Sequence, residues 1–222
     1  MRAAGIDVSH HKPVKDWDRL VASGVSFVAC KATEGLRYLD PTLRPHQAGF
    51  RSHDFALGIY YHFARSGDAA DQAGRLIDAV GDLRDHERLC LDLEVVPVLD
   101  GDADASLRWV DAFIKTILNE VQDRRPIVYT SRRIWRQIGD PAWEMAYDVD
   151  LWVPRYNAQG LEPALPKPWQ NWTFWQWTDG AAVDHVTPGV GRCDANWFNG
   201  DLDELRQYAN VAHDLSARHT EP

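Results

Sequence analysis

The chain has 222 residues, enough for one sizeable domain with its own core or for two very small ones. Apolar residues make up 45% and charged residues 26%, which excludes a chain disordered throughout and a disulfide-stapled miniprotein. With 24 basic and 33 acidic residues the formal net charge is −9, so no nucleic-acid partner is expected, because such binding needs a basic face. No apolar run is long enough to span a bilayer, so no membrane partner is expected either.

Short apolar runs alternate along the chain with longer segments of helical spacing. The predicted strands are Ala3–Val8, Val25–Cys30, Ala56–Phe63, Leu89–Val96, Pro126–Thr130, Val149–Val153 and Thr173–Trp177. A short segment at 192–196 is the last strand candidate. The predicted helices are Val14–Ser23, Ala69–Val80, Asp104–Val121, Arg132–Ile138 and Leu202–Ala212.

This order of elements predicts an α/β fold. Buried strands separated by helices indicate a parallel sheet with right-handed crossovers, and about eight strands in one domain favour a closed barrel. After Val153 the helices are short or missing, and Pro163, Pro166 and Pro168 indicate an irregular loop. We therefore expect a single irregular TIM-like (β/α) barrel whose C-terminal third is degenerate and lacks regular helices. Residues 1–215 would form one domain, the barrel, and 216–222 a frayed tail.

Two acidic residues stand out in the strand at Leu89–Val96. Period-two geometry puts Asp92 and Glu94 on one face, with the leucines on the other. Burying two like charges is costly and raises at least one pKa, which is how a carboxyl group becomes a general acid near neutral pH. Cleavage of a glycosidic bond needs such an acid and a second carboxylate. The alternative is a structural ion pair with Arg88 or Lys31.

Two further acids fall at the ends of other predicted strands, where a barrel keeps its chemistry. Asp7 and Asp194 are each weak evidence alone, because an aspartate there often caps a helix or a turn. Together with Asp92 and Glu94 they fit a sugar hydrolase or a divalent-metal site. Cys30, Cys90 and Cys193 have no metal spacing and are expected to be buried thiols, so we expect neither a metal nor a cofactor.

Tryptophan is the unusual component, with 10 residues in the chain, most of them after Trp143. Aromatic faces beside acids suit pyranose rings, whose C–H faces are apolar. Trp152 and Trp175 are expected near such a ring, although core packing is the alternative for any single tryptophan. His62, at a strand end, either lines the site or forms a hydrogen bond in the core.

Eight short segments, in order from end to end, carry a family resemblance. They are Gly5-Ile-Asp-Val-Ser9, Lys31-Ala-Thr-Glu-Gly35, Gly58-Ile-Tyr-Tyr-His-Phe63, Leu91-Asp-Leu-Glu94, Pro126-Ile-Val-Tyr-Thr130, Leu151-Trp-Val-Pro-Arg-Tyr156, Trp175-Gln-Trp177 and Asp194-Ala-Asn-Trp-Phe198. On these segments the chain resembles glycoside hydrolase family 25, the muramidases that cut bacterial cell-wall peptidoglycan. The irregular α/β barrel of that family agrees with the fold expected above.

The resemblance implies roles for particular residues. Glu94 would be the general acid, with Asp92 beside it and Asp7 and Asp194 completing the acidic site. The residues that would line the sugar groove are Tyr61, Tyr129, Trp152, Tyr156, Trp175 and Gln176, with Lys31 and Glu34 at its rim. The chain departs from the family pattern at Pro154 and Arg155.

The implied activity is hydrolysis of the β-1,4 bond between N-acetylmuramic acid and N-acetylglucosamine. The enzyme is expected to be a monomer, and its expected partner is bacterial peptidoglycan. An inactive glycan-binding protein, a chitinase-like enzyme and a metal-dependent hydrolase using the same acids are the alternatives. Asp7 precedes any apolar run, so no signal peptide is expected. The enzyme would be made in the cytoplasm and act on the wall after release, as phage lysins do, or be secreted with its leader removed.

Overall fold

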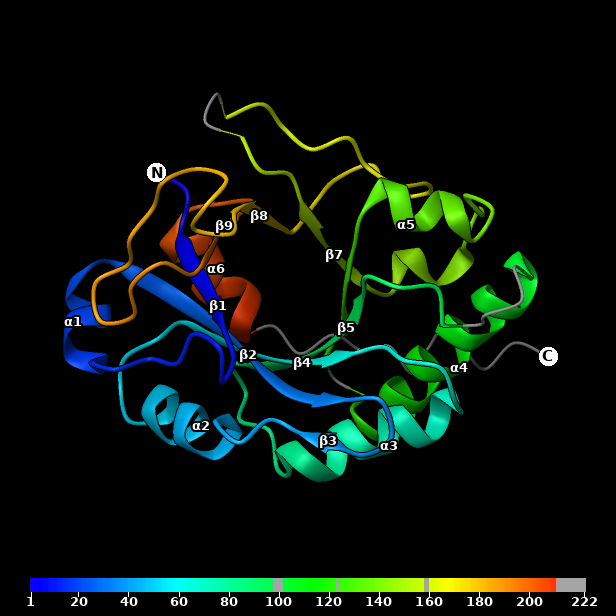
Figure 1. Ribbon diagram of the computed structural model, residues 1–222, viewed down its shortest axis with the longest axis horizontal. Coiled ribbons are helices and arrows are strands. Elements are labelled where there is room, and N and C mark those ends of the chain that lie inside the picture. Colours follow the sequence, from blue (N-terminus) through cyan, green and yellow to red (C-terminus); the bar gives the residue numbers. More distant parts are fainter. Residues whose placement is uncertain (98–101, 123, 158–159, 211–222) are drawn as a thin grey trace.

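The computed structural model describes residues 1–97, 102–122, 124–157 and 160–210 (Figure 1). Its eight long strands close a ring in the order β1 (Ala4–Val8), β9 (Asp194–Phe198), β8 (Phe174–Thr178), β7 (Asp150–Pro154), β6 (Ile127–Thr130), β5 (Glu87–Leu93), β4 (Leu57–Phe63) and β2 (Val25–Glu34), which pairs with β1 again. The short strand β3 (Tyr38–Leu39) is attached to the end of β2. The predicted irregular α/β barrel is confirmed, while its boundary at residue 215 and its tail lie outside the described residues.

One strand departs from the predicted parallel sheet. β9 runs antiparallel to both neighbours, β1 and β8, whereas the other ring pairings are parallel. A parallel neighbour needs a long crossover that returns the chain to the same end of the sheet, usually through a helix. The segment between β8 and β9 contains turns and an isolated bridge between Thr187 and Gly191, so the chain enters β9 from the opposite end.

Helices surround the strands on most sides, with α1–α5 on the outside of the ring in Figure 1. They are α1 (Trp17–Ala22), α2 (Leu43–Arg51), α3 (Ala69–Val80), α4 (Ala103–Glu120), α5 (Arg132–Gln137) and α6 (Leu202–Asn210), with a 3₁₀ turn η1 at Glu144–Tyr147. Side chains cap five of the N-termini, each accepting a hydrogen bond from the backbone N–H three residues on: Asp16, Asp68, Asp102, Ser131 and Asp201. Among the described helices, none is long and apolar enough to cross a membrane.

The interior of the barrel is filled by alternate residues of each strand. Phe27, Ile59, Cys90 and Phe174 belong to one buried cluster inside the ring. A Cβ at residue 5 would overlap the Phe27 ring, so this inward position on β1 needs glycine. The packing leaves the barrel solid at its centre rather than open as a pore.

Helix α6 covers the end of the barrel where the parallel strands begin. Leu205 and Ala209 join the interior cluster, and the Tyr208 hydroxyl donates to Asp150 Oδ2 over 2.8 Å. The buried Arg88, near the start of β5, donates through Nη2 to the Ala209 carbonyl over 2.9 Å. Among the described residues, α6 thus covers this end of the barrel, and the opposite end, where the parallel strands finish, is left for a ligand.

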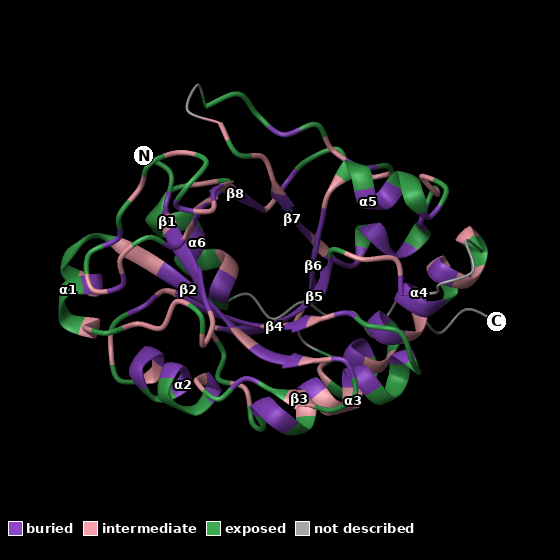
Figure 2. Cartoon of the chain, viewed as in Figure 1, coloured by how far each residue is buried: buried purple, intermediate pink, exposed green. Residues whose placement is uncertain are grey.

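The outer faces of the strands pack in two different ways. Over most of the ring they contact helices, and Figure 2 shows buried residues along the strands and exposed ones on the outer turns of the helices. Around β7 and β8, where regular helices are missing, Trp172 and Trp175 form a separate outer cluster with Leu151 and Val153. Tryptophan side chains thus cover the sheet there. Cys30, Cys90 and Cys193 are free and buried, as predicted.

Candidate active site

A cavity of about 210 Å³ opens where the parallel strands end, opposite α6. Its walls come from the loops and strand ends of β1, β2, β4, β5, β6, β7, β8 and β9: Asp7, Ser9, His11, Lys31, Tyr61, Phe63, Asp92, Glu94, Tyr129, Trp152, Tyr156, Gln176 and Asp194. All four acids predicted from the sequence therefore reach one cavity. This end of an α/β barrel is where enzymes of this architecture carry their chemistry.

The acidic pair of β5 has the predicted orientation. Leu91 and Leu93 pack outward among the helices, while Asp92 points inward and Glu94 follows directly after the strand. Asp92 is only 6% exposed, and its Oδ1 atom has no hydrogen-bond partner among the residues that the structure describes. A buried carboxyl oxygen without a partner is costly, so this atom is available to a ligand that enters the cavity.

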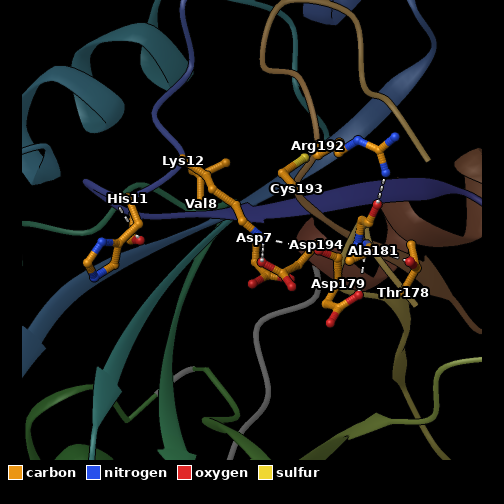
Figure 3. Close-up of polar contacts among 12 residues, drawn as sticks. Asp7, Val8, His11, Lys12, Thr178, Asp179, Ala181, Arg192, Cys193 and Asp194 are labelled. Atoms are coloured by element: carbon orange, nitrogen blue, oxygen red, sulfur yellow. Dashed lines mark hydrogen bonds and ion pairs between the residues drawn. The ribbon is translucent and has the colours of Figure 1, made fainter. Parts of the chain in front are cut away.

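Asp7 and Asp194 face each other from neighbouring strands. They are directly paired in the antiparallel ladder of β1 and β9, and Figure 3 shows their carboxyl groups side by side. Lys12 Nζ lies 3.6 Å from Asp194 Oδ2 and donates to the Asp179 carbonyl over 3.0 Å. This lysine draws the loop before β9 toward the loop after β1 and partly balances the Asp194 charge.

A chain of hydrogen bonds holds the inner wall of the cavity. Gln176 Nε2 and Asn196 Nδ2 both donate to Asp7 Oδ2, over 2.9 and 2.8 Å. Gln176 Oε1 in turn accepts from the hydroxyls of Tyr129 and Tyr156, each over 2.8 Å. Fixed by both amides, the Asp7 carboxyl group has a set orientation.

The same network orients the aromatic wall. Trp152 Nε1 donates to Asn196 Oδ1 over 2.8 Å, and its ring meets the Tyr129 ring edge to face at 4.8 Å. The Tyr61 ring lies edge to face with Trp152 at 6.4 Å. Rings held this firmly present a preformed apolar surface beside the acids, which suits the C–H face of a sugar.

Burial raises the pKa of every acid in the cavity. For Asp7, burial and then the Asp194 charge raise the pKa to about 8, although the amides of Asn196 and Gln176 act in the other direction. Burial and then the Glu94 charge hold the pKa of Asp92 well above its usual range. The pKa of Glu94 is raised by burial and then by Asp194, while Lys31 lowers it. Burial also raises the pKa of Asp194, against the effect of Lys12.

Two residues predicted for the sugar groove do not line the cavity. Trp175 is 1% exposed and belongs to the outer cluster, where its Nε1 donates to the Arg155 carbonyl over 2.9 Å. Its neighbour Gln176 points inward instead, because successive side chains of a strand face opposite sides. Glu34 pairs with Lys31 over 2.5 Å and with Arg65 over 2.7 Å, outside the cavity wall, while Lys31 itself lines it.

The sequence reasoning gave no role to several residues of the site. Asn196, which orients both Asp7 and Trp152, lies two residues after Asp194 on the same face of β9, so period-two spacing could have identified it. Ser9, His11 and Phe63 also line the cavity. They lie in loops or at the ends of strands, and the sequence pattern gives no clear signal of which such residues reach the cavity.

His62 was expected either to line the site or to form a hydrogen bond in the core, and its contacts show that it lies in the core. Nδ1 lies 2.8 Å from Thr33 Oγ1 and Nε2 lies 2.9 Å from Gln72 Oε1, with the ring fully buried outside the cavity. Burial lowers the pKa of His62 to about 4, so the ring is neutral and structural. Among the described residues, no group of three or more histidine, cysteine or acidic side chains has the arrangement of a metal site.

An α/β barrel with buried carboxyl groups and fixed aromatic rings at its open end defines a site of the glycoside-hydrolase class. Comparison with known families agrees with this class. The model for "Glycosyl hydrolases family 25" matches residues 6–186, and the chain belongs to that family.

Individual relatives are similar over most of their length. Lysozyme M1 of Streptomyces globisporus is 29% identical over 215 residues, which cover 93% of this chain and 71% of that protein. The solved structure of the bacterial lysozyme from Streptomyces coelicolor superposes with a TM-score of 0.84 at 26% identity, covering 95% of this chain and 98% of the other. A muramidase from Acremonium alcalophilum gives a TM-score of 0.82 at 30% identity, with coverages of 94% and 99%.

Proposed function

We propose that this protein is a lysozyme that hydrolyses the β-1,4 bond between N-acetylmuramic acid and N-acetylglucosamine in bacterial peptidoglycan. The observation that carries the proposal is the inward-facing pair Asp92 and Glu94, at the open end of the barrel and beside the Tyr129 and Trp152 rings. Membership of the family and similarity to proteins named lysozyme and muramidase give the same reaction.

Glu94 has the properties of the general acid. Burial raises its pKa, so the carboxyl group keeps its proton at a pH where an exposed glutamate has lost it. It lines the cavity directly after the end of β5, where it can reach a bound sugar. In the proposed first step Glu94 gives its proton to the glycosidic oxygen as the bond from that oxygen to the anomeric carbon breaks.

We propose that Asp92 acts on the sugar that contains the anomeric carbon of the broken bond. Its free Oδ1 atom can accept a hydrogen bond from the acetamido N–H of the substrate and so orient the acetamido oxygen toward the anomeric carbon. Asp7 is held by two amides beside Asp194. The positive charge that develops on the sugar ring lowers the pKa of Asp7, so Asp7 releases its proton to solvent and the two carboxylates stabilise that charge. Water then adds to the anomeric carbon and completes hydrolysis.

Digestion of purified peptidoglycan, with mass analysis of the products, tests the proposal. The expected products are disaccharide-peptides whose new reducing end is N-acetylmuramic acid, released at the same rate with and without EDTA. New N-acetylglucosamine reducing ends, or cleavage of chitin oligosaccharides in preference to the wall, would indicate the chitinase-like alternative. Wall binding without new reducing ends would indicate an inactive glycan-binding protein, and loss of activity with EDTA a metal-dependent one.

How the enzyme reaches the wall, and its monomeric state, are further parts of the proposal. Release after synthesis in the cytoplasm predicts full-length protein in the cytoplasmic fraction until the cells lyse, whereas secretion predicts it in the medium of intact cells. Sedimentation equilibrium is expected to give the mass of a single chain, 25.2 kDa.

A further inference from the structure

A second hollow of about 250 Å³ adjoins the catalytic cavity. The two share Glu94, Tyr129 and Tyr156, so a substrate bound at the acid borders both. The remaining walls of this side hollow come from the start of α5 and the end of β7: Ser131, Arg133, Ile134, Pro154 and Arg155.

The side hollow and the catalytic cavity differ in charge. The catalytic cavity has four carboxyl groups and, among its walls, Lys31 as its only lysine or arginine. The side hollow has two arginines and shares a single carboxyl group, that of Glu94. The binding surface therefore changes from acidic to basic where the two hollows meet at Glu94, on a chain whose formal net charge is −9.

Of the basic side chains in the two hollows, Arg133 is the one whose N–H groups are available to a ligand. Lys31 pairs with Glu34 over 2.5 Å, and Arg155 Nη1 donates to the Glu162 carbonyl. Within the described part of the chain, by contrast, Arg133 has no hydrogen bond and no ion pair, and its charge acts on Glu94 from the wall of the hollow. A guanidinium group in this state offers a planar pair of N–H donors, the geometry that matches a carboxylate.

We propose that the side hollow binds a carboxylate carried by the muramoyl residue of the substrate, with Arg133 as its main partner and Arg155 in support. This inference rests on the proposed function. N-acetylmuramic acid differs from N-acetylglucosamine by a lactyl ether on O3, so its glycan carries either the lactyl carboxylate or the carboxylates of a peptide joined to it. Charge complementarity makes Arg133 a specificity determinant for muramoyl glycans over chitin, which has no carboxylate.

The test compares Arg133→Gln with the wild type on matched substrates. These are a peptide-free tetrasaccharide of alternating N-acetylglucosamine and N-acetylmuramic acid, the same tetrasaccharide with its lactyl groups converted to methyl amides, and a fragment that carries the stem peptide. We expect KM for at least one carboxylate-bearing substrate to rise about fivefold, as for loss of a partly exposed charge pair. For the methyl amide KM should change by less than about twofold.

Two controls separate carboxylate binding from other effects of the substitution. Arg133→Lys keeps the charge near Glu94 but removes the planar pair of donors, so it should weaken carboxylate recognition while leaving the pH profile in place. Arg132→Gln makes the same change at the preceding residue, which is exposed and outside the hollow, and should leave all three KM values unchanged.

The outcomes show which carboxylate is bound, and they separate failure of the Arg133 proposal from failure of the proposed function. A KM increase on the peptide-free tetrasaccharide identifies the lactyl carboxylate, and an increase only on the peptide-bearing fragment identifies the stem peptide. Equal increases on all three substrates, or none, would overturn the role of Arg133. If the wild-type enzyme cleaves no muramoyl substrate, the proposed function itself has failed.

Discussion

Replacing Asp7 by asparagine should stabilise the protein and impair its activity. The buried Asp7 carboxyl group has a pKa of about 8 in the folded chain, against 3.8 for its ordinary value. A carboxyl group with a raised pKa contributes stability that is fully present below its unfolded-state pKa and is lost as the pH rises through its folded-state pKa. Asparagine has no proton to lose, and its side-chain oxygen can accept both hydrogen bonds that Gln176 and Asn196 now donate.

The pKa difference sets the size of this effect. At pH 7 the unfolded chain has lost the Asp7 proton while the folded chain mostly keeps it. A gap of about three units between pH 7 and 3.8, at about 1.4 kcal/mol per unit, corresponds to about 4 kcal/mol. The stability advantage of Asp7→Asn should therefore grow from near zero at pH 4 to about 4 kcal/mol at pH 7, while turnover falls at least about tenfold.

Urea unfolding followed by tryptophan fluorescence at pH 4 and pH 7 measures this advantage. The matched control is Asp40→Asn, because Asp40 is equally buried but accepts hydrogen bonds from His10 and Thr42, which lower its pKa. Its stabilising effect is present above its unfolded-state pKa, so Asp40→Asn should destabilise the protein at pH 7. If Asp7→Asn gave no gain at pH 7, or the same gain at both pH values, our explanation of the Asp7 pKa would be refuted.

Three further predictions concern the surroundings of the acids. Lys31→Met removes the cation that lowers the pKa of Glu94 and Asp92, so the alkaline limb of the kcat–pH profile should move up by about half a unit to one unit; an unmoved limb would contradict it. Asn196→Ala removes the hydrogen bonds to Asp7 and from Trp152 and should cost about 2–4 kcal/mol, lowering Tm by about 5–10 °C in calorimetry; a Tm shift below about 2 °C would count against the network. Trp175→Phe should lower stability by about 1–3 kcal/mol with KM for the glycan unchanged, and a raised KM would return Trp175 to the sugar site.

Local periodicity predicted the elements whose buried faces are apolar. The alternation of leucine with Asp92 and Glu94 was enough to place both acids on the inner side of β5. Helix α2 was missed because its buried face includes His46, Gln47 and Gly49, which do not form an apolar stripe in the sequence. The antiparallel direction of β9 was also beyond prediction, since strand direction depends on the path of the connecting loop.

The candidate site shows where period-two reasoning stops. It separates Trp175 from Gln176, but it cannot say which of the two faces inward. Trp175 was expected inside because an aromatic face beside the acids suits a sugar ring. Around β8 the tryptophans themselves cover the sheet, and the polar Gln176 therefore reaches Asp7 in the cavity.

The central claim is that Glu94 donates the proton that breaks the glycosidic bond. Its most direct test is the rate at which purified Glu94→Gln protein releases new N-acetylmuramic acid reducing ends from peptidoglycan. Glu120→Gln is the matched control, because Glu120 is exposed at the end of α4 and lines neither the catalytic cavity nor the side hollow. We expect Glu94→Gln to lose activity by at least about 100-fold, with folding intact and the control near wild type. Activity of Glu94→Gln within a few fold of wild type would contradict the account.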